Sequence, residues 1–239
     1  MKPKLLLFFA VIFTVNVFGQ NLSKVGMTNL NFVDEQRKNW TGDAPRPLAI
    51  TVWYPTNSEA SEEKIIIGNP ANPIFISGAA IGNAEISPAK KRYPLIVVSH
   101  GTGGAALQMM WLGQYLAARG FIVAAVNHHG NTGAEDKYQA QGFILWWERA
   151  RDLTVAIDKL LADSKFSNHI DSKRIGAAGF SLGGSTVISL AGGIFAIENF
   201  NKFCASPERD ATCDPQPEYA AAIKEFNELK TSSSGPIAL

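Results

Sequence analysis

The sequence DSKRIGAAGFSLGG, residues 171–184, decides the fold of this 239-residue chain. Its second half fits the pattern Gly-x-Ser-x-Gly, with Gly179, Ser181 and Gly183 at the fixed positions. Glycine is needed two residues before and two residues after the serine, because a side chain at either position would collide within a very tight turn. An apolar strand precedes this turn and an apolar helix, 185–191, follows it. This context predicts a serine hydroxyl that projects from the carboxyl edge of a sheet, whereas the pattern alone would also fit an ordinary Gly/Ser-rich turn.

A second glycine-rich segment, HGTGG at residues 100–104, follows an earlier apolar run, 94–99. Such a continuous run is typical of a parallel strand that is buried on both faces. Ligands of open α/β sheets bind at the carboxyl ends of the strands. We expect Gly101, Gly103 and Gly104 to leave backbone amides accessible there. One of these amides is expected to pair with the amide of Leu182 as an oxyanion hole, in which one donor contributes about 3 kcal/mol. A phosphate-binding loop is the alternative, but the chain contains neither of the usual glycine patterns for one.

The rest of the chain alternates between strand and helix patterns. Strands are predicted at 25–33, 47–54, 94–99, 121–126 and 174–179. One helix is predicted to have a face made of Leu107, Trp111, Tyr115 and Ala118, and another a face made of Leu153, Ile157, Leu160 and Leu161. Residues 56–92 are predicted to form a long surface excursion with a short strand at 65–67. The alternation predicts an α/β fold with a mostly parallel, doubly wound sheet. It stops near residue 192, so we expect 193–235 to form a lid-like insertion.

The two glycine-rich motifs together resemble those of α/β-hydrolases, over roughly residues 25–192. The pattern is similar to bacterial dienelactone-hydrolase-like proteins and to platelet-activating-factor acetylhydrolases. The resemblance implies that Ser181 is the nucleophile, that the amides of Thr102 and Leu182 hold the oxyanion, and that no cofactor is used. Dienelactone hydrolase itself has cysteine at the nucleophile position, so the serine here looks more like an acetylhydrolase or a carboxylesterase. Phe180 also departs from the histidine often found before the serine.

The rest of a catalytic triad is harder to find in the sequence. In this fold the acid and then the histidine follow the serine, yet all four histidines of the chain precede Ser181. Asp210 and Asp214 follow it, but neither comes after a recognisable strand. We therefore expect the chain to end before the strands that carry the acid and the base. His128 is expected two strand spacings from the serine, about 10 Å, and His100 is expected to support its loop. Metal binding by 128–129 is not expected, because neighbouring strand residues face opposite sides.

The first nineteen residues have the pattern of a secretory signal peptide. Lys2 and Lys4 precede an apolar run, 5–18, and cleavage is expected after Gly19. A membrane anchor is the alternative, but the run is shorter than the roughly 20 residues that a spanning helix needs. Export predicts a disulfide between Cys204 and Cys213, with two free thiols as the alternative. We expect one domain, 20–239, in a periplasmic or secreted protein.

The charge balance excludes some kinds of partner. With 22 basic and 21 acidic residues, the net charge is +1, so no basic field is available for nucleic acid or for an anionic membrane. No stable membrane insertion is expected after the leader is removed. The function predicted is an exported serine hydrolase acting on short acyl esters, by analogy with the resembling families. Two alternatives remain: a non-catalytic or degenerate binding protein that ends at Leu239, and a peptidase of the same fold.

Overall fold

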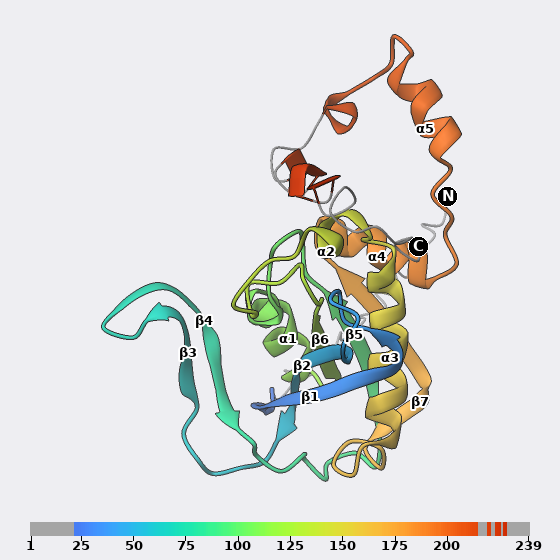
Figure 1. Cartoon of the computed structure of the whole chain (residues 1–239). Helices are drawn as coiled ribbons and strands as arrows, with labels where there is room; N and C mark the ends of the chain where they lie inside the picture. Colours follow the sequence, from blue (N-terminus) through green and yellow to red (C-terminus); the bar gives the residue numbers. More distant parts are fainter. Residues whose placement is uncertain (1–21, 215–218, 221–222, 226, 229–239) are drawn as a thin grey trace, which may run out of the picture.

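The computed structural model describes residues 22–214, 219–220, 223–225 and 227–228. The predicted leader, 1–19, lies outside the described residues, and so does much of the second half of the predicted insertion. Figure 1 shows a central sheet with helices beside it and a segment after α4 that extends away from the sheet.

The described residues form one seven-stranded mixed sheet with the order β3-β4-β1-β2-β6-β5-β7. The parallel strands β6, β5 and β7 form one side of the sheet, and β2 joins them antiparallel to β6. β1 pairs antiparallel with β2 and parallel with β4. Every strand predicted from the sequence is present. The strand bounds are β1 (Lys24–Lys38), β2 (Pro45–Thr56), β3 (Glu63–Asn69), β4 (Asn72–Gly82), β5 (Tyr93–Ser99), β6 (Ile122–Asn127) and β7 (Ile170–Gly179).

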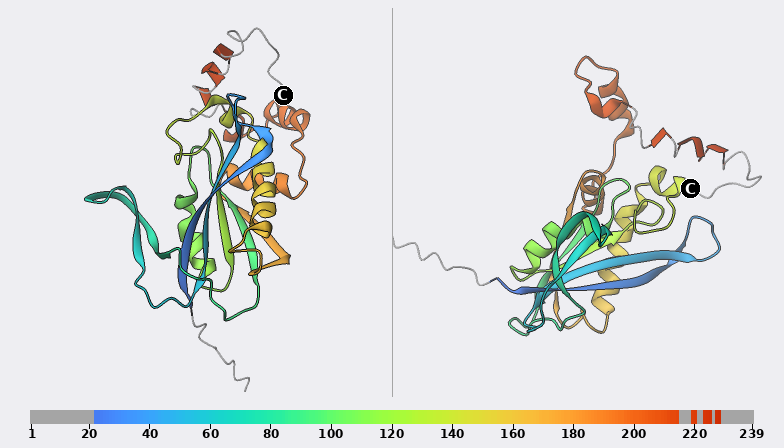
Figure 2. Two further views of the ribbon diagram at one scale, coloured as in Figure 1. Left: turned by 60° about the horizontal axis from the view of Figure 1, so that its bottom comes forward. Right: turned by 90° about the vertical axis from the view of Figure 1, so that its left-hand side faces the viewer.

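Helices cover both faces of the sheet, which makes the fold doubly wound (Figure 2). Helix α1 packs on one face against Trp53 and Val98. Helices α3 and α4 pack on the other face, where Leu153 and Leu160 join the core. The helices are η1 (Ala106–Met109), α1 (Met110–Ala117), α2 (Ala140–Ile144), α3 (Glu148–Ala162), α4 (Leu182–Leu190), α5 (Ile197–Cys204) and η2 (Ala211–Cys213).

The segment predicted as a surface excursion, 56–92, is more ordered than the sequence indicated. β3 and β4 form an antiparallel hairpin, and β4 extends the main sheet by pairing with β1 at Gly26 and Met27. The predicted short strand 65–67 lies within β3, but β4 was not predicted because its residues do not alternate between apolar and polar. Ile74, Phe75 and Ile76 are consecutive and all exposed. A two-residue turn at 70–71 joins the strands.

The predicted apolar face of α1 is also wrong. Trp111 and Tyr115 are 61% and 55% exposed, and the helix instead buries Met110, Gly113 and Ala117. Gly113 explains the rotation, because a Cβ at this position would overlap the ring of Trp53. The absence of a side chain lets the helix backbone lie directly on the indole, which turns the two large aromatic residues outward.

The segment after α4 contains the predicted disulfide. Cys204 at the end of α5 is joined to Cys213 in η2, and α5 buries none of its residues. A bridge in such an exposed segment restrains chain that has little core of its own. Among the described residues, no helix has the length and apolar character required to cross a bilayer.

Candidate active site

Ser181 lies on a strained turn between β7 and α4. Its backbone has a φ of 52° and a ψ of −123°, and only one other described non-glycine residue, Asn83, has a positive φ. Such a conformation costs on the order of 1–3 kcal/mol and persists only where the surroundings enforce it. Here a Cβ at Gly179 would overlap the backbone of Gly183, and one at Gly183 would overlap the carbonyl of Ser99. The two motif glycines are therefore sterically required.

A cleft of about 300 Å³ opens in front of this turn. Ser181 lines it together with Gly101, Thr102 and Gly104 of the second motif, so the two predicted motifs meet at one site. A Cβ on Gly101 would lie 3.3 Å from the Cβ of Ser181, which shows how closely the loop approaches the serine. The exposed rings of Trp111 and Phe180 form further walls.

Two amides of the loop 100–104 are already engaged in hydrogen bonds. The amide of Gly103 donates to Asn131 Oδ1 at 2.6 Å, and the amide of Gly104 donates to the carbonyl of Gly101 at 3.2 Å. Within the described part of the chain, the amide of Thr102 has no acceptor. Leu182 is the first residue of α4, so its amide has no acceptor inside the helix. The two amides predicted to hold an oxyanion are therefore both free to donate.

The histidines do not supply a base for Ser181 in the described residues. His100 and His128 are buried, and His129 Nδ1 donates to the carboxylate of Glu135 at 2.8 Å. No described side chain forms a hydrogen bond with the Ser181 hydroxyl. The described residues also contain no group of three or more His, Cys, Asp or Glu side chains placed to hold a metal ion.

Comparison with known proteins finds similar sequences and structures. A family model described as PET hydrolase-like matches residues 82–197. Cutinase est1 of Thermobifida alba is 33% identical over 101 residues, which are 41% of this chain and 30% of the cutinase. The chain thus spans about a third of the length of the curated cutinases it matches. The solved ferulic acid esterase from Streptomyces cinnamoneus superposes with a TM-score of 0.58 and 26% identity, over 70% of this chain and 55% of the esterase. The chain therefore has the α/β-hydrolase fold.

Another similar protein is a peptidase by name. Dipeptidyl-peptidase 5 of Porphyromonas gingivalis is 33% identical over 107 residues, which are 43% of this α/β-hydrolase and 15% of the peptidase. The matches to cutinases and to a peptidase involve similar lengths of this chain.

His100 holds the loop of this α/β-hydrolase in place. Its Nδ1 lies 2.7 Å from the carbonyl oxygen of Gly101, and it donates because a carbonyl only accepts. Burial, and then the positive charge of Arg149, lowers the pKa of His100 to about 3, so the ring is neutral at pH 7. This arrangement agrees with the supporting role expected for the residue.

A buried ionic cluster lies behind the loop. We define it as Asp152, Arg37, Arg46, His128 and Arg149. Asp152 accepts two hydrogen bonds from Arg46, at 2.8 and 3.0 Å, and one from Arg37 at 2.6 Å. His128 Nδ1 lies 3.0 Å from the same carboxylate. The sequence analysis missed this cluster, because charged residues such as Arg149 and Asp152 near the start of a helix are typical of a solvent-exposed face.

The cluster reaches the end of β5, where loop 100–104 begins. Arg149 Nη2 donates to the carbonyl of His100 and, at 3.2 Å, to the hydroxyl of Ser99. His128 Nε2 lies 2.9 Å from the same hydroxyl. Burial lowers the pKa of Arg149 to about 10, although Asp152 opposes the shift, so the guanidinium remains charged at neutral pH. The cluster therefore fixes the backbone from which the loop departs.

The free energy of unfolding of this α/β-hydrolase should fall as the pH is lowered from 7 to 5. His100 and His128 both have a pKa below the usual 6.5 in the folded state, chiefly because of burial. In the unfolded chain they take up protons near pH 6.5, so the unfolded state binds more protons and gains stability below that pH. Each ring should contribute up to about 1.4 kcal/mol per pH unit. Urea unfolding at pH 7, 6 and 5 measures the slope, and a flat profile would contradict the neutral buried rings.

Proposed function

We propose that this α/β-hydrolase cleaves carboxylic esters with Ser181 as its nucleophile. The observation that carries the proposal is the strained Ser181 backbone at the front of a cleft, between the amides of Thr102 and Leu182. Strain of this kind is kept at positions where function requires it. The names of the similar proteins, cutinases and a ferulic acid esterase, support an ester as the substrate.

The chemistry proposed is acyl transfer in two steps. The Ser181 oxygen attacks the ester carbonyl, its proton passes to a base, and the carbonyl oxygen becomes an oxyanion that accepts from Thr102 and Leu182. Collapse of this intermediate expels the alcohol, which takes the proton, and water then releases the acid from the acylated serine. We propose that the acid and base of the triad lie outside the printed sequence, because all four histidines precede Ser181 and those behind the loop are engaged in supporting it.

We propose that residues 193–235 form a lid beside this site, as the sequence analysis expected. The support is that the described start of this segment packs next to the turn. Phe195 lies against Trp146 with ring centroids 5.8 Å apart, and both line a hollow of about 210 Å³ together with Leu182. We further propose that the protein is exported. The leader-like residues 1–19 and the Cys204–Cys213 disulfide support an oxidising compartment.

Substrate class is tested with the intact protein and two sets of chromogenic substrates. We expect p-nitrophenyl acetate and butyrate to be hydrolysed with a higher kcat/KM than dipeptidyl p-nitroanilides. The ester is the easier bond to break, so the comparison also needs alanine p-nitrobenzyl ester and the matching amide to correct for intrinsic reactivity. A preference for dipeptidyl anilides after this correction would replace the esterase proposal with the peptidase alternative. Failure to hydrolyse either set would favour a non-catalytic protein.

A further inference from the structure

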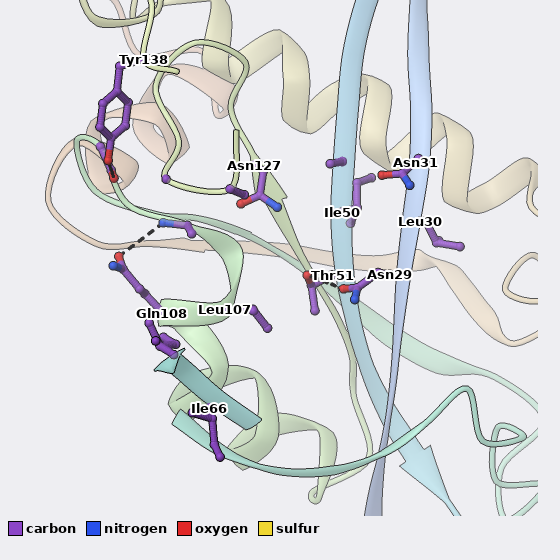
Figure 3. A pocket seen from close by; sticks show the side chains of 17 residues that line it. Asn29, Leu30, Asn31, Ile50, Thr51, Ile66, Leu107, Gln108, Asn127 and Tyr138 are labelled. Atoms are coloured by element: carbon purple, nitrogen blue, oxygen red, sulfur yellow. Dashed lines mark hydrogen bonds between the residues drawn. The ribbon is translucent and has the colours of Figure 1, made fainter. Parts of the chain in front are cut away.

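A larger cavity, of about 500 Å³, lies beside the loop 100–104 and is distinct from the serine cleft. It is bounded by β1, β2, the β3–β4 hairpin and η1. Five polar side chains define what we call the amide-lined cavity: Asn29, Asn31, Thr51, Gln108 and Asn127. Figure 3 shows that the first three approach it from β1 and β2, whereas Gln108 approaches from the helical side. A cavity of this size is within the usual range for small-molecule sites.

The cavity carries no formal charge. All 17 residues that line it are uncharged. Phosphates and carboxylates bind where arginine, lysine or a helix N-terminus compensates their charge, and ammonium groups bind where a carboxylate does. The lining therefore favours a neutral ligand.

The polar groups of the cavity retain unused hydrogen-bonding capacity. Asn29 uses only its oxygen, which accepts from the Thr51 hydroxyl at 2.8 Å, and Gln108 uses only its oxygen, which accepts from the amide of Ala105 at 3.3 Å. Asn127 likewise accepts twice and donates nothing to the described residues. The Asn31 carboxamide forms no hydrogen bond in the described part of the chain, so both its donor and its acceptor are available.

Asn29 and Asn31 form what we call the polar wall of the cavity. This wall arises from a change of residue type along one face of β1. Val25 and Met27 pack on the side of the sheet that α1 covers. Because alternate strand residues share a face, Asn29 and Asn31 continue the same row beyond that packing. Asparagine is depleted in strands, so two of them in one row need a reason other than strand formation.

Aliphatic side chains face this polar wall. Ile66 from β3 and Leu107 from η1 line the cavity on the side away from β1 (Figure 3). An entirely apolar ligand would leave the carboxamides without partners at a cost of about 1–3 kcal/mol each. A ligand with hydroxyl groups along one edge and C–H groups on its faces satisfies both walls.

We propose that the amide-lined cavity binds a saccharide unit. Vicinal hydroxyls each donate and accept, which matches the paired donor and acceptor of a carboxamide, and the C–H face of the ring would lie on Ile66 and Leu107. Gln108 lines both this cavity and the serine cleft, so the saccharide would lie next to the cleft. The site does not depend on Ser181 being a nucleophile.

The test is a titration of the intact, isotope-labelled protein with cellobiose and xylobiose, followed by NMR of the backbone and side-chain amides. We expect saturable shifts at millimolar concentrations for the side-chain amides of Asn29 and Asn31. Replacing Asn31 by leucine keeps the size and removes the carboxamide, and should weaken binding about fivefold or more, as expected for one hydrogen bond. The fold should be unaffected, because this carboxamide makes no contact that the structure requires.

The matched control is Asn72→Leu, the same change at an exposed strand residue outside the cavity. It should leave the affinity unchanged, and Ser181→Ala protein should bind as well as the wild type. Three results would overturn the proposal: no saturable shift with either disaccharide, equal affinity in the Asn31→Leu variant, or stronger binding of benzyl alcohol that improves when Asn31 is leucine. The last result would identify the cavity as a site for apolar groups.

Discussion

Replacing Ser181 by alanine should abolish ester hydrolysis by the intact protein and its covalent labelling by a fluorophosphonate. Among the residues that line the cleft, Ser181 alone is on a strained turn beside two free amides. Alanine removes its hydroxyl but keeps the Cβ, so the backbone conformation costs the same. Loss of a serine nucleophile lowers kcat by a factor on the order of 10⁶ in the best-studied hydrolases. Residual activity would reflect the oxyanion-binding amides alone. The measurements are kcat/KM for a p-nitrophenyl ester and the labelled fraction by intact mass.

The control for this prediction is a serine on β7, the strand that precedes the turn. Ser172 is exposed near the start of β7, far along the strand from the turn, so Ser172→Ala should leave both labelling and turnover unchanged. Labelling that persists in Ser181→Ala would show that a different serine reacts, and would contradict the role we propose for the turn.

Replacing Asp152 by asparagine should destabilise the protein by about 3–5 kcal/mol, since breaking a buried ion pair leaves its partners uncompensated. Arg46 is 2% exposed and donates two hydrogen bonds to this carboxylate, while Arg37 donates a third. Burial raises the pKa of Asp152, but Arg46 and the hydrogen bond from His128 outweigh it and hold the pKa well below its usual value. Asparagine preserves the shape of the side chain, so the loss measured by urea unfolding reports the charge.

The matched substitution on the same helix is Asp158→Asn. Asp158 is exposed on α3, and its replacement should change the free energy of unfolding by no more than about 0.5 kcal/mol. If the two variants unfold at the same urea concentration, the cluster contributes no net stability. If Asp152→Asn instead stabilises the protein, the desolvation of these charges exceeds their attraction.

The sequence predicted those parts of the site that depend on short motifs with fixed spacing. A tight turn between a strand and a helix needs glycines at fixed spacing, so Ser181 and its neighbours were found directly. The meeting of the two motifs followed from parallel strands ending at one sheet edge, as β5 and β7 do. Both inferences rest on backbone geometry, which a short stretch of sequence determines.

The features that sequence missed depend on partners distant in the chain. Asp152 lies beside the buried Leu153 on α3, and its burial is tolerable because Arg37 and Arg46, more than a hundred residues earlier, donate to it. The face of α1 was assigned wrongly because the bulky Trp111 was taken as core, whereas the missing side chain of Gly113 decides the packing. The hydrophobic period of a helix shows which faces could be buried. The residues that pack against the helix determine which face is buried.

The link between Arg46 and Asp152 spans 106 positions along the chain. A nascent polypeptide that has formed only the β1–β2 hairpin has Asp34 to pair with Arg37, but it has no carboxylate from α3 to neutralise Arg46. We therefore expect the hairpin to be buried only after α3 has been synthesised. Folding then depends on contacts between residues far apart in the sequence, and such contacts form slowly. In the export that we propose, the β1–β2 hairpin would therefore stay unfolded, and so able to pass through a translocation channel, until α3 followed.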